Sequence, residues 1–163
     1  MRYQKIIILV FFLLTLSGCQ AQTKESFSVI ESTLNGNPII CSFNMAYRDF
    51  KQKSNYPWCL TISIALDLKN LYPNKLPLPE ETQIANDIQD QLVSKIKKIT
   101  KVEYVGHLFN DAFLDIYIYL NKPDRVHEFL QIEKDKESLI RGIAYEIKED
   151  PNWATVQGFL TTK

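Results

Sequence analysis

His107 and Asp115 are the candidate residues for acid–base chemistry in this chain. A carboxylate beside an imidazole raises its basicity, which is the arrangement that general acid–base catalysis uses. A turn at Asn110-Asp111 separates them. With three loop residues the turn would place the pair on one sheet face, whereas a two-residue turn would point His107 into the core. The pair has no evident nucleophile beside it, so we expect a structural hydrogen bond, and a hydrolase using His107 and Asp115 is the alternative.

Tyr117 and Tyr119 extend this candidate surface site, because alternation along the expected strand 113–120 puts them on the face of Asp115. Cys59, Thr61 and Ser63 of a neighbouring strand should share that face. A binding surface would use these exposed side chains. Cross-strand pairing, or cover by the C-terminal Trp153 and Phe159, would also account for the tyrosines.

The order of the expected elements predicts how these residues are held. Hydrophobic periodicity and turn residues indicate a hairpin around Asn35-Gly36, strands at 58–66, 102–109, 113–120 and 139–147, helices starting near Pro79 and Pro123, and a C-terminal tail. Right-handed crossovers would place both helices on one side. We therefore expect an α+β fold, a ferredoxin-like antiparallel sheet with two helices on one face, extended by an N-terminal β-hairpin. The second face is then solvated, covered by the tail, or used for binding.

The N-terminus has the features of an export signal. Arg2 and Lys5 precede an apolar run, Ile6 to Leu16, that is too short to span a membrane and ends in small residues. We divide the chain into a signal peptide at 1–18, a polar tether at 19–25 and a single domain at 26–163.

Residues Leu16-Ser17-Gly18-Cys19 resemble the lipobox of bacterial lipoproteins. The resemblance implies that Cys19 becomes the acylated N-terminus of an exported protein, which the lipid then holds at a membrane. Gln20 follows Cys19 where an acidic retention residue would otherwise stand. By analogy with lipoprotein sorting, the outer membrane is expected if the bacterium has two membranes.

Charge and composition exclude several classes of ligand. Removing Arg2 and Lys5 leaves 17 basic against 19 acidic residues, a formal charge near −2, which argues against nucleic acid. Lys95, Lys97 and Lys98 end an expected helix, where cations complement its dipole. The 5 glycines form no phosphate-binding loop and the 2 histidines lack metal-ligand spacing, so we expect no cofactor and no metal.

Two cysteines of the mature domain, Cys41 and Cys59, raise the question of a disulfide in an exported protein. Strand alternation groups Cys41 with the apolar residues of its strand and places Cys59 opposite those of its own. We therefore expect the two on opposite faces and unbridged, although a β-bulge would reverse the parity.

Several motifs resemble a bacterial family known as domain of unknown function 695. They are Asn35-Gly36-Asn37-Pro38, Tyr56-Pro57-Trp58, Tyr104-Val105-Gly106, Asp115-Ile116-Tyr117-Ile118-Tyr119 and Asp150-Pro151-Asn152-Trp153. The family implies no activity or catalytic residues, and it is similar to protein inhibitors of ribonuclease E.

We therefore expect a lipid-anchored cell-envelope protein that acts as a non-enzymatic binding or accessory module, contacting an envelope protein partner through the second sheet face. The alternatives are an inhibitor that docks onto an enzyme, favoured by any uncovered apolar patch at the hairpin edge, and the hydrolase named above.

Overall fold

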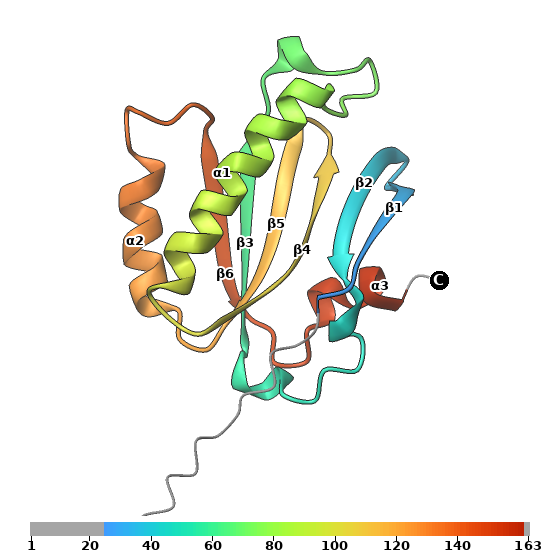
Figure 1. The fold of residues 1–163 in the computed structure, drawn as a ribbon. Coiled ribbons are helices and arrows are strands. Elements are labelled where there is room, and N and C mark those ends of the chain that lie inside the picture. Colours follow the sequence, from blue (N-terminus) through green and yellow to red (C-terminus); the bar gives the residue numbers. More distant parts are fainter. Residues whose placement is uncertain (1–24, 162–163) are drawn as a thin grey trace, which may run out of the picture.

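The computed structural model describes residues 25–161. The expected signal peptide, Cys19 and most of the tether lie outside the described residues. One six-stranded sheet forms the framework, with strand order β1-β2-β4-β5-β3-β6 and every neighbouring pair antiparallel (Figure 1). The strands are β1 (Phe27–Leu34), β2 (Asn37–Asn44), β3 (Trp58–Ala65), β4 (Val102–Asn110), β5 (Phe113–Leu120) and β6 (Ile143–Glu149). Within the described residues three α-helices accompany it: α1 (Pro79–Lys97), α2 (Asp124–Lys134) and α3 (Ala154–Thr161). The expected α+β class is confirmed.

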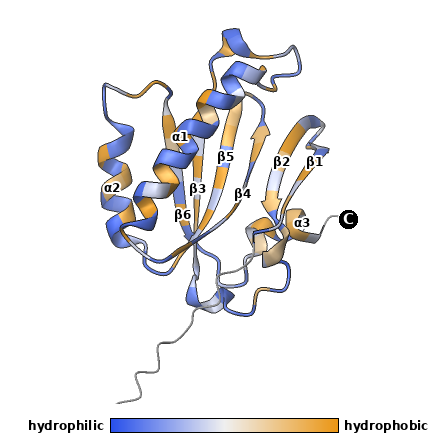
Figure 2. Cartoon of the chain, in the orientation of Figure 1, coloured by the Kyte–Doolittle hydropathy of each residue, from blue (hydrophilic) through white to orange (hydrophobic). Residues whose placement is uncertain are grey.

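The hairpin and the first helix form as the local signals predict. Asn35 and Gly36 adopt positive φ angles of 51° and 84°, which makes the two-residue turn that pairs Leu34 with Asn37. Pro79 opens α1, acidic residues occupy its first turn and lysines its last. Figure 2 shows α1 with hydrophilic and hydrophobic sides, as a helix resting on a sheet requires.

An aliphatic core lies on the α1 side of the sheet. It combines inward residues of β3 and β5, such as Ile62 and Ile116, with Leu92 and Ile96 of α1 and Leu130 of α2. All but Leu92 are wholly buried, and Leu92 is 4% exposed. This core holds the centre of the sheet to the two helices.

A second, aromatic core lies on the other side of the sheet. It contains Phe43, Tyr119, Trp153 and the α3 residues Val156 and Leu160, all of them buried. The expected C-terminal tail is therefore partly wrong, because residues 154–161 form the helix α3 (Figure 1). The last strand also begins at Ile143 rather than Leu139.

No helix among the described residues has the length and apolar character needed to cross a bilayer.

Candidate functional site

The structure does not pair His107 with Asp115, because the turn between them is the shorter of the two considered from sequence. Asp111 and Ala112 form a two-residue turn with positive φ angles, so Asn110 pairs with Phe113 and His107 pairs with Ile116. Residues directly opposite in an antiparallel pair share a face, which puts His107 on the α1 side. Asp115 pairs with Ser63 and lies on the other side. The carboxylate therefore cannot orient the imidazole, and the hydrolase hypothesis loses its base.

His107 instead contacts a tyrosine of its own strand. The hydroxyl of Tyr104 lies 2.7 Å from Nδ1 of His107. A register shift between Tyr104 and Gly106 adds a residue to β4, so side chains three apart come to one face. Gly106 is needed there, because a Cβ atom would lie 2.4 Å from the carbonyl oxygen of Ser42. Burial lowers the pKa of His107 to about 4, although nearby Asp90 acts to raise it. The imidazole is consequently neutral at physiological pH.

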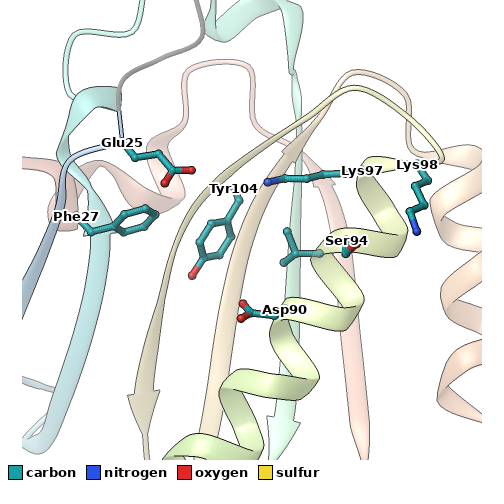
Figure 3. Close-up of a pocket in the computed structure, with 8 residues that line it drawn as sticks. Glu25, Phe27, Asp90, Ser94, Lys97, Lys98 and Tyr104 are labelled. Carbon is teal, nitrogen blue, oxygen red and sulfur yellow. The ribbon is translucent and has the colours of Figure 1, made fainter.

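An open cleft lies beside Tyr104, between the end of α1 and the start of β1. Its volume is about 530 Å³. Figure 3 shows the Asp90 carboxylate directed toward the Tyr104 hydroxyl, with Lys97 reaching over the cleft from α1 and Glu25 facing it from the entering chain. Burial raises the pKa of Tyr104 well above its ordinary value. The cleft offers a neutral hydroxyl between charges of both signs, which suits polar contacts better than proton transfer.

Asp115 lies in a polar, partly buried part of the second face. Ser63 donates a hydrogen bond of 2.5 Å to its Oδ1 atom. Burial raises the pKa of Asp115, and the Ser63 hydroxyl partly offsets that effect. The neighbouring Thr61 and Tyr117 are partly buried. The expected face of Asp115, Ser63, Thr61 and Tyr117 is therefore present, without His107.

Tyr117 and Tyr119 differ in their surroundings. The Tyr119 side chain is wholly buried and stacks on Trp153 with ring centroids 4.0 Å apart, so its assignment to a surface site is wrong. Tyr117 lies 5.8 Å from the ring of Phe43 and 6.1 Å from that of Phe159. Cover by Trp153 and Phe159, one of the two explanations considered from sequence, is what the structure shows.

Residues Asp150-Pro151-Asn152-Trp153 hold this cover in place, and we call them the C-terminal latch. Asp150 accepts hydrogen bonds from the Tyr119 hydroxyl at 2.7 Å and from the Ala154 and Thr155 amides at 2.8 and 3.0 Å. Burial acts to raise the pKa of Asp150, but these hydrogen bonds together outweigh it and leave the pKa below its ordinary value. The Trp153 indole donates to the Tyr56 carbonyl at 3.1 Å. The latch thereby caps α3 and seals the aromatic core.

Cys41 and Cys59 are both free and buried, but not for the reason expected. Both belong to the aromatic core and so lie on the same face, contrary to the parity argument. Strands β4 and β5 separate β2 from β3, and neighbouring strands are about 4.8 Å apart, so the two sulfur atoms cannot meet. Burial raises the pKa of both thiols.

Among the described residues, strand β1 is an open edge of the sheet, the hairpin edge at which an uncovered apolar patch was considered from sequence. Its side chains Phe27 and Val29 are 43% and 70% exposed, and Glu31 is its single charged residue. The Met45 amide donates a hydrogen bond to the Ser26 carbonyl, and Leu34 pairs with Asn37 at the turn. Every second residue of the strand, counted from Ser26 to Leu34, therefore forms its backbone hydrogen bonds with β2. Phe27, Val29, Glu31 and Thr33 therefore direct their backbone amides and carbonyls away from β2. The alternation of Phe27, Val29 and Glu31 was the available signal, but it does not reveal which strand ends the sheet.

The opposite edge, β6, is guarded. Exposed Glu146 and Lys148 alternate along it, and the Tyr145 hydroxyl lies 3.0 Å from Nδ1 of His127 on α2. Charges and a covering helix are the usual protection of an edge strand. Of the two edges, β1 is the one that charged residues and a helix protect less.

Comparison with known proteins places this fold in a family. The model of a family of unknown function, DUF695, matches residues 25–161, which are also the residues the structure describes. The chain belongs to the DUF695 family. No curated protein and no solved structure matches it. The DUF695 match includes the hairpin, the sheet and the C-terminal latch, so the open β1 edge lies within the family region.

Proposed function

We propose that this DUF695 protein is a lipid-anchored domain of the bacterial cell envelope that binds another protein by accepting a strand at β1. The observation that carries the proposal is the unprotected edge, where four residues direct their backbone amides outward and two of them, Phe27 and Val29, also have exposed apolar side chains. An extended segment that adds to a sheet edge gains main-chain hydrogen bonds, and alternate side chains supply specificity. The lipobox-like Leu16-Ser17-Gly18-Cys19 supports export, acylation at Cys19 and, in a two-membrane cell, the outer membrane.

A ferredoxin-like arrangement suits this function. Read from β6, the order β6-β3-β5-β4 and its two helical crossovers match that arrangement, and the β1–β2 hairpin extends the sheet beyond β4. Residues of α1 and α2 share one aliphatic core, which supports their placement on one face. The hairpin then carries the binding edge away from both helices (Figure 1).

The chemistry of β1 defines the strand it accepts. Val29 favours an apolar residue directly opposite, and Glu31 favours a basic one, since cross-strand pairs of these kinds stabilise a sheet. A second copy of the chain fits less well. Antiparallel pairing of β1 with itself would separate the two Phe27 residues along the strand by roughly 20 Å. The two tethers would then enter their domains at points far apart, although both tethers are short and both chains must reach the same membrane.

An inhibitor that docks onto an envelope enzyme is the second candidate. The exposed Phe27 and Val29 form the uncovered apolar patch at the hairpin edge that favours it. It uses the same edge, so the identity and activity of the captured partner decide between a general binding module and an inhibitor.

Photo-cross-linking in native cells tests the strand-accepting edge. A photoreactive residue replaces Thr33, and the adduct is compared between Val29→Pro and Val29→Thr backgrounds. Proline removes the outward amide of residue 29, whereas threonine keeps it. We expect one heterologous adduct that persists with threonine and falls at least tenfold with proline. An adduct unaffected by proline, or one formed with a second copy of the chain, would overturn the proposal. A photoreactive residue at Glu146 on β6 is the matched control and should give no such adduct.

A further inference from the structure

Four lysines gather at the end of the domain where the chain enters, and we call Lys97, Lys98, Lys101 and Lys122 the basic end. All four are exposed. Lys97 and Lys98 line the cleft of Figure 3, and the Asn121 amide bonds the Lys101 carbonyl at 3.1 Å, which places Lys122 beside them. Within residues 25–161 none of the four forms an ion pair. Their charges are therefore directed at solvent or at a partner.

The helix dipole accounts for only part of this cluster. Lysines in the last turn of α1 complement the dipole, and these are Lys95 and Lys97. Lys95 also lies 3.3 Å from Glu133 of α2 and so has a structural partner. Lys101 and Lys122 lie outside both helices, where the dipole gives no reason for a cation. A second explanation is needed for the basic end.

The position of the chain entry supplies that explanation. Glu25 lines the same cleft as Lys97 and Lys98, so the tether reaches the domain beside the basic end (Figure 3). Six residues lead from Cys19 to Glu25, and a fully extended chain of that length spans roughly 20 Å. If Cys19 is acylated, this end of the domain is the one held close to the lipid surface.

An exposed aromatic residue completes the surface. Phe27 is 43% exposed and contacts the ring of Tyr104 at 5.9 Å, on the opposite side of the cleft from the lysines. Aromatic side chains and lysines are the residues that interfacial membrane contacts combine. Phe27 is therefore suited to enter the headgroup layer while the basic end meets its phosphates.

We infer that the basic end and Phe27 rest on a membrane that contains anionic phospholipid and so orient the anchored domain. This inference rests on the proposed anchor and adds the partner of this surface, the lipid headgroups. The orientation would leave the turn at Asn35-Gly36 at the distal end, and the part of the β1 edge after Phe27 would run away from the membrane and stay accessible (Figure 1).

Flotation with vesicles tests the contact without the lipid anchor. The chain from Gln20 to Lys163 contains every described residue and lacks Cys19. It is mixed with vesicles of phosphatidylcholine alone, or of phosphatidylcholine with phosphatidylglycerol. The double variant Lys98→Gln/Lys101→Gln is compared with a control double variant, Lys69→Gln/Lys75→Gln. The control removes the same amount of charge from the opposite end of the domain. Each lysine near an anionic membrane surface strengthens the binding of a protein to that membrane by about fivefold.

We expect the wild-type chain to float only with the anionic vesicles and to lose this binding at high salt. The basic-end variant should bind roughly twentyfold more weakly, and the control variant within twofold of wild type. Absent binding, equal binding to neutral vesicles, or equal losses in both variants would overturn the inference. Intact-mass analysis of the native protein reports acylation at Cys19 separately, so failure of the anchor and failure of this contact are distinguishable.

Discussion

Two buried carboxylates, Glu81 and Asp150, hold opposite ends of the molecule by different means. Glu81, at the start of α1, is wholly buried and accepts two hydrogen bonds from the Arg141 guanidinium at 2.7 and 2.6 Å. Asp150, at the other end of the sheet, binds a tyrosine hydroxyl and the first amides of α3. Glu81 is thus held by an opposite charge, whereas neutral donors hold Asp150.

The difference shows how each half of the sheet is stabilised. The Arg141 side chain lowers the pKa of Glu81 against the opposing effect of burial, and it ties the loop before β6 to α1. The Asp150 latch positions α3, whose Phe159 ring stacks on Phe43 of β2 at 4.5 Å. One end of the molecule therefore depends on an ion pair, whereas at the other end the packing of α3 against the hairpin depends on neutral hydrogen bonds and aromatic stacking.

The largest effect is expected from Arg141→Met. It leaves the Glu81 carboxylate buried without its countercharge, which costs about 3–5 kcal/mol of unfolding free energy. Urea unfolding measures the loss. The double variant with Glu81→Met should recover much of it, because removing both charges leaves no buried ion. A single-variant loss below about 1 kcal/mol would mean that solvent reaches Glu81.

Removing the latch carboxylate should cost somewhat less. Asp150→Ala loses a helix cap and leaves the buried Tyr119 hydroxyl without its partner, together about 2–4 kcal/mol. The same substitution in a Tyr119→Phe background should cost about 1 kcal/mol less, since no buried hydroxyl then loses its hydrogen-bond partner. Thermal unfolding of the four proteins checks this coupling. Additive losses would show that the hydroxyl does not depend on Asp150.

His107 should set a separate acid limit on stability. Its folded pKa is about 4, below the ordinary value of 6.5, so the unfolded chain takes up a proton first as the pH falls. The contribution of neutral His107 to the free energy of unfolding is complete above pH 6.5 and diminishes as the pH falls toward about 4. His107→Gln should flatten this part of the pH–stability curve, measured by urea unfolding. An unchanged slope would contradict the assignment. Glu81 and Asp150, with lowered pKa values, lose their contributions only at lower pH, below their ordinary values of 4.5 and 3.8.

The smallest effect on folding is expected at the edge of the hairpin side. Val29→Pro removes an amide that β2 does not use, so its cost should be about 1 kcal/mol or less. Ile30→Pro removes an amide that pairs with Cys41 and should cost about 3 kcal/mol or more. Similar losses by thermal unfolding would show that the β1 register differs from the one described.

Local patterns sufficed to predict the hairpin, α1 and most strands. The Asn35-Gly36 turn, the Pro79 start and the alternation along β5 each depend on residues close in sequence. The position of His107 was undetermined because one loop residue more or less reverses its face. The cover by α3 depends on contacts distant in sequence, such as Trp153 with Tyr56. Strand order likewise follows from long-range pairing, so the sequence could suggest a hairpin edge but not which of its two strands ends the sheet.

Amide hydrogen exchange of β1, measured with and without the partner identified by cross-linking, shows whether this strand accepts another. We expect the outward amides of Phe27, Val29, Glu31 and Thr33 to become protected when the partner binds, whereas the β6 amides should be unchanged. Protection confined to the cleft beside Tyr104 or to β6, with the four β1 amides still exchanging freely, would contradict it.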